Sequence, residues 1–226
     1  NTGRELIEIE AHQQAVNVIA WSPDSARLVT GGEDGYARIW DAVSGSELAA
    51  IFTQGEPVTH AAWNSAGSLV VTGSPQGARV WDAGTVAELV NLAPKWYNLT
   101  FVAWSNDGAR LVTGGLGSAQ VWNLPENPAS GGDVLTLDSS TSHEHAAPAM
   151  GIGGIAHASW NKDDSRILSV SGNGTAEIWD TTSGESLVFL IGHTDGVNTG
   201  VWSPDETLVA TASDDGTARI WEATSG

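Results

Sequence analysis

Short hydrophobic runs separated by turn sequences recur along the whole chain. In the first part of the chain these runs occupy Val16–Trp21, Arg27–Thr30, Tyr36–Trp40 and Glu47–Phe52. The sequences Ser-Pro-Asp, Asp-Gly and Ser-Gly lie between them and favour tight reversals, because proline presets φ and glycine accepts a positive φ. Valine, threonine, glycine and tryptophan abound, whereas helix-favouring runs of glutamate, lysine and leucine are missing. The pattern therefore predicts an all-β chain of short antiparallel strands.

Ten of the 11 tryptophans follow a regular spacing in two series. The first series is Trp21, Trp63, Trp104, Trp160 and Trp202, and the second is Trp40, Trp81, Trp122, Trp179 and Trp221. Within a unit the two tryptophans are 18 or 19 residues apart, and 23 residues lead to the next unit, except for one step of 38. This spacing predicts five repeats of about 41 residues, the fourth with 15 additional residues, over about 5–45, 46–85, 86–127, 128–184 and 185–226.

The sequence from Gly192 to Trp221 resembles a known repeat family. It reads Gly-His-Thr-Asp-Gly-Val, then Trp-Ser-Pro-Asp, then Ser-Asp-Asp-Gly-Thr and a final Trp. Together with the Ile-Trp-Asp endings of other units, this is similar to WD-repeat β-propellers. The resemblance covers essentially the whole chain and implies one propeller domain over residues 1–226. Its blades would be four-stranded and antiparallel, and would stack because one blade cannot bury both of its faces alone.

The resemblance also implies a structural tetrad of a histidine, a hydroxyl residue, a turn aspartate and the second tryptophan. In the fifth unit these would be His193, Ser213, Asp215 and Trp221. Partial sets remain elsewhere: His12, Asp34 and Trp40 in the first unit, with Gly32 at the serine position, and Ser171 and Trp179 in the fourth, with Asn173 in place of the acid. Units two and three would keep only Trp81 and Trp122. We therefore expect blades two to four to be locally less stable, by about 1 kcal/mol per lost hydrogen bond.

Composition excludes several classes of function. Nine basic and 27 acidic side chains give a formal net charge of −18, which argues against nucleic acid as a partner. No apolar run approaches the roughly 18 residues that span a membrane, no signal peptide is visible, and we expect a cytoplasmic protein. The chain has no cysteine, so zinc–thiolate sites and thiol nucleophiles are excluded. The acidic charge itself fits a solvated rim, solubility in high salt, or a basic partner.

No residue pattern predicts catalysis, a metal or a cofactor. The histidine, serine and aspartate of the fifth unit resemble a hydrolase triad, but the tetrad would commit His193 to Asp215 and the serine. His60 and His157 share a first-strand register, where packing between blades competes with a channel metal site. We expect a non-enzymatic protein without metal or cofactor.

Two segments are candidates for binding a partner protein, because neither belongs to the blade pattern. Lys95, Trp96 and Tyr97 precede the third unit, and Trp96 is the tryptophan outside both series. The long insertion of the fourth unit, with His143, His145 and Met150, would lie beside them. Exposed aromatic residues next to a methionine-bearing loop suit a binding hot spot. The alternative is that Trp96 packs beneath the long loop and that residues 143–145 are a solvated loop.

These features favour a protein-interaction scaffold or sensor module, as the propeller region of a larger regulatory protein. The alternative is a structural subunit of a filament or multi-protein shell. Two arrangements of the repeats remain open. A strand at about Glu5–Glu10 could complete the fifth blade and close a five-bladed ring, or the chain could be a segment of a longer array.

Overall fold

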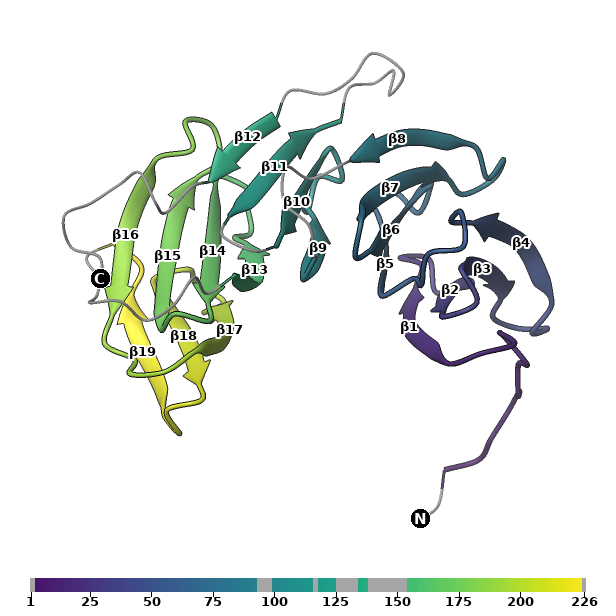
Figure 1. Ribbon diagram of the computed structural model, residues 1–226, viewed down its shortest axis with the longest axis horizontal. Coiled ribbons are helices and arrows are strands. Elements are labelled where there is room, and N and C mark those ends of the chain that lie inside the picture. The colour runs from purple at the N-terminus through teal and green to yellow at the C-terminus, as the bar shows by residue number, and fades with distance from the viewer. Residues whose placement is uncertain (1–2, 93–98, 116–117, 125–133, 138–153, 225–226) are drawn as a thin grey trace. The chain divides into compact units, whose positions relative to one another are not determined.

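The computed structural model describes residues 3–92, 99–115, 118–124, 134–137 and 154–224. Strands β1–β19 form five antiparallel sheets, which we call blades one to five in chain order. The chain divides into two compact units, Asn1–Ala93 with blades one and two, and Pro94–Gly226 with blades three to five. Figure 1 shows each blade as an up-and-down meander of consecutive strands. The all-β fold and the five repeats are confirmed.

Unit one contains two four-stranded sheets. Blade one consists of β1 (Val16–Trp21), β2 (Arg27–Gly32), β3 (Tyr36–Asp41) and β4 (Glu47–Phe52). Blade two consists of β5 (His60–Trp63), β6 (Leu69–Ser74), β7 (Gly77–Asp82) and β8 (Glu88–Leu92).

Unit two contains two four-stranded sheets and one sheet of three strands in the part that the structure describes. Blade three is β9 (Phe101–Trp104), β10 (Arg110–Gly114), β11 (Ala119–Asn123) and β12 (Val134–Leu137). Blade four is β13 (Ile155–Trp160), β14 (Arg166–Ser171), β15 (Thr175–Asp180) and β16 (Ser186–Ile191). Blade five is β17 (Val197–Trp202), β18 (Leu208–Ser213) and β19 (Ala218–Glu222).

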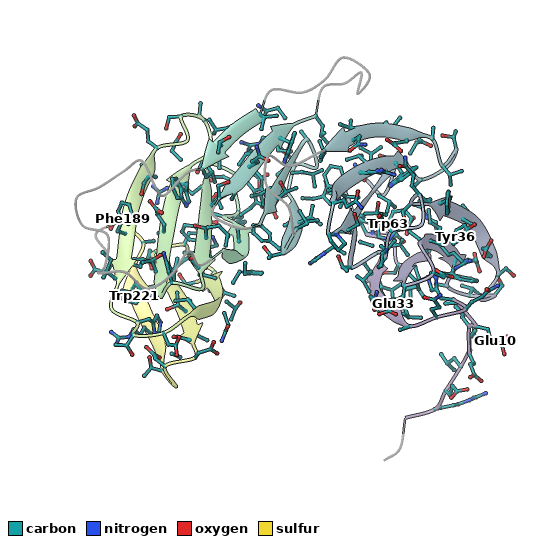
Figure 2. All side chains as sticks on the ribbon, viewed as in Figure 1. Glu10, Glu33, Tyr36, Trp63, Phe189 and Trp221 are labelled. Carbon is teal, nitrogen blue, oxygen red and sulfur yellow. The ribbon has the colours of Figure 1, made fainter. Side chains whose placement is uncertain are left out.

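The first-series tryptophans join neighbouring blades within a unit. Trp63 of blade two donates from Nε1 to the Ala20 carbonyl of blade one, at 3.3 Å. The Arg27 guanidinium lies 4.6 Å from the centre of the Trp63 ring and also donates to the Gly67 carbonyl. Trp63 is 7 % exposed and belongs to the apolar core that blades one and two share (Figure 2). This stacking buries the faces that single blades leave open.

Unit two repeats that arrangement. Trp160 of blade four donates to the Ala103 carbonyl of blade three, and Trp202 of blade five donates to the Ser159 carbonyl of blade four. Arg110 covers the Trp160 ring as Arg27 covers Trp63. The regular spacing of the first tryptophan series thus reflects one contact that recurs between successive blades of a unit.

The turn between the second and third strands requires glycine in blade one. Gly35 has φ of +77°, and a Cβ there would lie 2.6 Å from the Gly55 Cα. Both the backbone conformation and the close approach therefore exclude larger residues.

Residues 3–15 form no strand in the structure, and ring closure through a strand at about Glu5–Glu10 stays a prediction, because blade five belongs to the other unit. A strand persists only where a neighbouring edge completes its backbone hydrogen bonds, and these residues pair with no described strand. Instead they run along blade one, where a Cβ on Gly45 would come within 2.7 Å of Ile7 Cγ2. The Ala11 carbonyl accepts a hydrogen bond from Arg38 Nη1.

Candidate functional site

The second-series tryptophans each bond to a hydroxyl on the neighbouring strand of their own blade. In every case the indole Nε1 donates to a side-chain oxygen that lies on the second strand. The pairs and their distances are Trp40–Thr30 at 2.9 Å, and Trp81–Thr72, Trp122–Thr113, Trp179–Ser169 and Trp221–Thr211 at 2.8 Å. This contact recurs in all five blades.

Blade five extends this contact into a four-membered chain. The Thr211 hydroxyl lies 2.8 Å from His193 Nε2, and His193 Nδ1 lies 2.8 Å from Asp215 Oδ2. Because a carboxylate only accepts hydrogen bonds, His193 carries its proton on Nδ1 and Nε2 accepts from Thr211. The His193 ring meets Trp221 edge to face, with ring centres 6.0 Å apart. Both ring nitrogens of His193 are therefore engaged, and its ring is unsuited to act as a general base.

The assignment of the hydroxyl to Ser213 is wrong. In the strand register Trp221 pairs with Val209, and Thr211 is the next residue on the same face. Ser213 is four residues from Val209, roughly 13 Å along the strand, which is beyond the reach of the indole. The Ser213 hydroxyl instead donates to the Asp195 carbonyl, at 3.0 Å.

Blade one has a complete chain as well, contrary to the expectation that Gly32 interrupts it. His12 Nε2 lies 2.8 Å from the Thr30 hydroxyl, which also accepts from Trp40. His12 Nδ1 lies 2.9 Å from Asp34 Oδ1. A Cβ at Gly32 would come within 2.5 Å of His12 Nδ1, so the glycine makes room for the imidazole.

Arg38, on the third strand of blade one, binds the Asp34 carboxylate at the oxygen that does not bond to His12. Arg38 Nη1 donates to Asp34 Oδ2 at 3.0 Å. Although partial burial opposes it, the hydrogen bonds from Arg38 and His12 lower the pKa of Asp34 to about 2. In blade five, hydrogen bonds from the Thr217 hydroxyl and from His193 hold the pKa of Asp215 far below its usual range, although partial burial opposes this shift.

We expect the hydrogen-bonded tetrad of blade one to contribute less to the stability of the protein in acid. A carboxyl whose pKa is lowered by folding stabilises the protein above about pH 4, and this contribution is lost as the pH falls towards 2. Asp34→Asn should be about 1 kcal/mol less stable than the wild type at pH 6 and should lose less stability between pH 4 and 2. Urea unfolding followed by tryptophan fluorescence at several pH values measures both. Glu33→Gln, next to it and exposed, is the matched control. An unchanged acid slope in Asp34→Asn would contradict the expectation.

Blades two to four keep more of the tetrad than the sequence predicts, because Thr72, Thr113 and Ser169 supply the hydroxyls. Ser171, predicted for this role in blade four, donates to the Gly154 carbonyl instead. Asn173 replaces the acid and accepts from the Thr175 backbone and hydroxyl, as Asp215 does from Thr217. The sequence signal for the hydroxyl was a Thr or Ser ten residues, or nine in the shortened units, before the second tryptophan.

The structure brings together no metal site among the residues it describes, where no group of three histidine, cysteine or acidic residues could hold an ion. His157 lies beside Phe101, with ring centres 6.3 Å apart. Burial lowers the pKa of His157, and its buried Nδ1 has no hydrogen-bond partner. In the described part of the chain, no helix is long and apolar enough to cross a membrane.

The residues predicted to bind a partner lie outside the described residues. These are Lys95, Trp96, Tyr97, His143, His145 and Met150.

What the structure does describe at the blade edges is a set of tightly hydrogen-bonded acidic turns. Asp41, Asp82 and Asp180 each accept from two backbone N–H groups and one hydroxyl of their own turn. Those hydrogen bonds lower the pKa of all three carboxyls, so the turns stay charged and ordered.

Comparison with known proteins identifies the repeat. The WD40 family pattern (WD domain, G-beta repeat) matches residues 3–41, 46–82, 95–123 and 184–222, together more than half of the chain. The chain is 36 % identical over 64 residues to a periodic tryptophan protein 2 homolog of Dictyostelium discoideum. It is 41 % identical over 44 residues to periodic tryptophan protein 2 of Saccharomyces cerevisiae. These stretches cover 28 % and 20 % of the chain, but 7 % and 5 % of the two relatives.

Proposed function

Because the chain belongs to the WD40 repeat family, whose domains are generally non-catalytic scaffolds for protein interaction, we propose that it docks a partner protein with a basic surface. The observation that supports this most is the combination of charge and rigidity at the blade edges. The formal net charge is −18, and the turns at Asp41, Asp82 and Asp180 are held by their own hydrogen bonds. Ordered like charges attract a basic partner at long range and lose little entropy on binding.

The hydrogen bonds of His193 support a role as a scaffold rather than as an enzyme. Its two ring nitrogens bond to Thr211 and Asp215, and the residue is 8 % exposed. The side chains that resemble a hydrolase triad thus hold the blade together. As a scaffold, the chain would need no cofactor and would act as a region of a larger regulatory protein.

We propose that the acidic blade edges attract the partner at long range and that the segments outside the blades recognise it on contact. Trp96→Ala and Tyr97→Ala should leave the melting temperature nearly unchanged and weaken partner binding about tenfold or more, as expected for aromatic hot-spot residues. Purification of the partner by affinity capture, followed by calorimetric titration of the wild type and each variant, measures the effect. Phe52→Ala, which removes an exposed aromatic residue of blade one, is the control. A large fall in melting temperature would show that Trp96 packs in a core.

The same titration tests the charge. Affinity should fall as salt rises, because screening weakens long-range attraction between exposed charges. Affinity that is independent of salt would contradict a basic partner while leaving a docking role intact.

A structural role in a filament or shell is the second candidate, and one observation favours it. In unit one Trp21 is 60 % exposed, whereas its equivalent Trp63 is 7 % exposed. Ile19 on the same strand is 63 % exposed, so β1 presents an apolar face that its own unit does not cover. If a second copy covers this face, light scattering should detect assemblies that grow with protein concentration. Trp21→Ser would then abolish them, whereas Trp96→Ala would not.

A further inference from the structure

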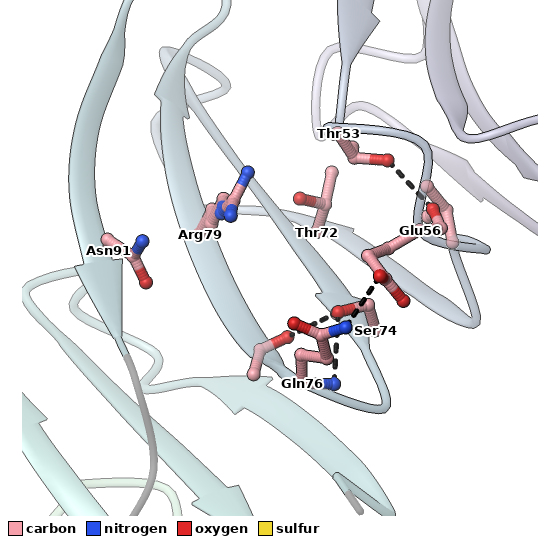
Figure 3. Close-up of a pocket in the computed structure, with 10 residues that line it drawn as sticks. Thr53, Glu56, Thr72, Ser74, Gln76, Arg79 and Asn91 are labelled. Atoms are coloured by element: carbon pink, nitrogen blue, oxygen red, sulfur yellow. Dashed lines mark hydrogen bonds between the residues drawn. The ribbon is translucent and has the colours of Figure 1, made fainter.

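Unit one contains a polar cavity of about 190 Å³ in blade two (Figure 3). At roughly 30 Å³ per water molecule, this is room for about six waters or one small organic molecule. Three of its polar side chains lie side by side on neighbouring strands, because Asn91 pairs with Arg79 and Arg79 pairs with Thr72. The other polar residues that line it include Thr53, Glu56, Ser74 and Gln76.

Blade one shows what fills the corresponding space when the tetrad is complete. There Thr30 pairs with Arg38, as Thr72 pairs with Arg79 in blade two. The His12 imidazole bonds to Thr30, and the Asp34 carboxylate bonds to both His12 and Arg38. A ring nitrogen and a carboxylate thus complete the hydrogen bonds of the hydroxyl and the guanidinium.

Blade two lacks both of these groups. Gln54 stands at the sequence position of His12, nine residues before the first-series tryptophan, but it is exposed and does not line the cavity. The turn between β6 and β7 is shortened, with Ser74 paired directly to Gly77, and no aspartate remains in it. The cavity is therefore the space that one imidazole and one carboxylate occupy in blade one.

Two hydrogen-bond donors are left without acceptors. Arg79 Nη1 is buried and has no hydrogen-bond partner, and the nearest carboxylate oxygen, Glu88 Oε2, is 3.9 Å away. The Thr72 hydroxyl accepts from Trp81, but among the described residues its own proton has no acceptor. Buried donors without acceptors destabilise a protein, so a ligand that accepts both bonds would be held.

The opposite wall restricts the charge of such a ligand. Glu56 accepts from the Gln76 side-chain amide at 2.5 Å and lines the cavity, and Glu88 Oε2, which does not line it, is 3.9 Å from Arg79 Nη1. A doubly charged phosphate would meet one guanidinium that already has Glu88 nearby, and one carboxylate on the cavity wall, Glu56. A single carboxylate on a polar ring matches the donors without that excess of negative charge.

We propose that the cavity of blade two binds a heteroaromatic ring that carries one carboxylate, with the carboxylate on Arg79 and a ring nitrogen accepting from Thr72. The ligand reproduces the imidazole and carboxylate that His12 and Asp34 supply in blade one. This chemistry has two sources. One is a free heteroaromatic acid, and the other is a histidine at the carboxyl terminus of a peptide.

Calorimetric titration with imidazole-4-carboxylate tests the proposal. From the binding energy per atom of small ligands, we expect a Kd on the order of 1 mM. 4-Methylimidazole, which lacks the carboxylate, should bind the wild type at least tenfold more weakly. Equal affinity of the two compounds, or no saturable heat at tenfold higher concentration, would overturn the proposal whatever the variants do.

Variants then locate the site. Arg79→Met keeps the aliphatic stem and should weaken imidazole-4-carboxylate at least tenfold. Arg219→Met is the matched control and should bind as the wild type does, because Arg219 holds the same strand position in blade five, where His193 and Asp215 are present. Unchanged affinity in Arg79→Met would show that the ligand binds elsewhere.

A third comparison distinguishes the two sources. The tripeptide Gly-Gly-His and its carboxyl-terminal amide are titrated beside imidazole-4-carboxylate. Tighter binding of the tripeptide, lost in the amide, assigns the site to a peptide terminus, and tighter binding of imidazole-4-carboxylate assigns it to a free acid. Either result supports the cavity as a carboxylate site and is independent of whether the blade edges dock a basic protein.

Discussion

Thr211→Val is expected to destabilise the protein by about 2–3 kcal/mol, because it removes one hydroxyl that serves two buried partners. The Trp221 indole N–H loses its acceptor, and His193 Nε2 loses its donor, both at 2.8 Å in the wild type. Valine has nearly the same shape as threonine, so the packing of Thr211, which is 2 % exposed, is otherwise preserved. Urea unfolding at pH 7 measures the difference in the free energy of unfolding.

Ser213→Ala is the matched control for this prediction. Its hydroxyl donates to the Asp195 carbonyl and accepts from the Asp215 backbone N–H, and no hydrogen bond joins it to the tryptophan. We expect a loss of about 1 kcal/mol, since one of these bonds is exposed and the other is only partly buried. If Ser213→Ala cost as much as Thr211→Val, the hydroxyl of the chain would have been assigned to the wrong residue.

Glu177→Gln is expected to stabilise the protein at pH 8 by about 2–3 kcal/mol and to have no effect at pH 4. Glu177 is 4 % exposed on β15, between Ser169 and Phe189 on the neighbouring strands. Burial raises its pKa to about 7, with the Ser186 hydroxyl opposing the shift. In blades one, two and five an arginine holds the same strand position, namely Arg38, Arg79 and Arg219.

The direction of this effect follows from the raised pKa. In the folded state Glu177 keeps its proton up to about pH 7, whereas in the unfolded chain it loses it near 4.5. Wild-type stability therefore falls as the pH rises from 4.5 to 7, and glutamine abolishes that fall. Thermal melts at pH 4, 6 and 8 measure it, with the exposed Glu185→Gln as control. A gain of equal size at pH 4 would show that packing rather than charge is responsible.

The tetrad shows which residue roles a family resemblance predicts from the sequence and which it does not. Its histidine, aspartate and tryptophan positions can be read from the sequence, but Ser213 and Thr211 both lie on the same face of one strand. Only the register between β18 and β19 decides which hydroxyl lies beside the indole. The same reason explains why Gly32 looked like a defect in blade one, where it makes room for His12.

The shortened turns show a second limit. The sequence reveals that units two and three have lost one residue between their tryptophans and that Gln54 replaces a histidine. It does not reveal whether the side chains around this loss close over the vacant space. In blade two they leave a cavity with Arg79 Nη1 unpaired, which depends on how three strands and one turn pack.

The all-β fold, the five repeats and the two tryptophan series can be predicted without a structure, because strand alternation, turn chemistry and spacing are local properties of the chain. Tertiary structure alone decided which partners those residues take. Trp63, Trp160 and Trp202 of the first series bond to the preceding blade of their own unit, and the second-series tryptophans bond to hydroxyls within their own blade. Both depend on register and stacking between segments distant in the chain, where a shift of two residues along a strand exchanges one partner for another.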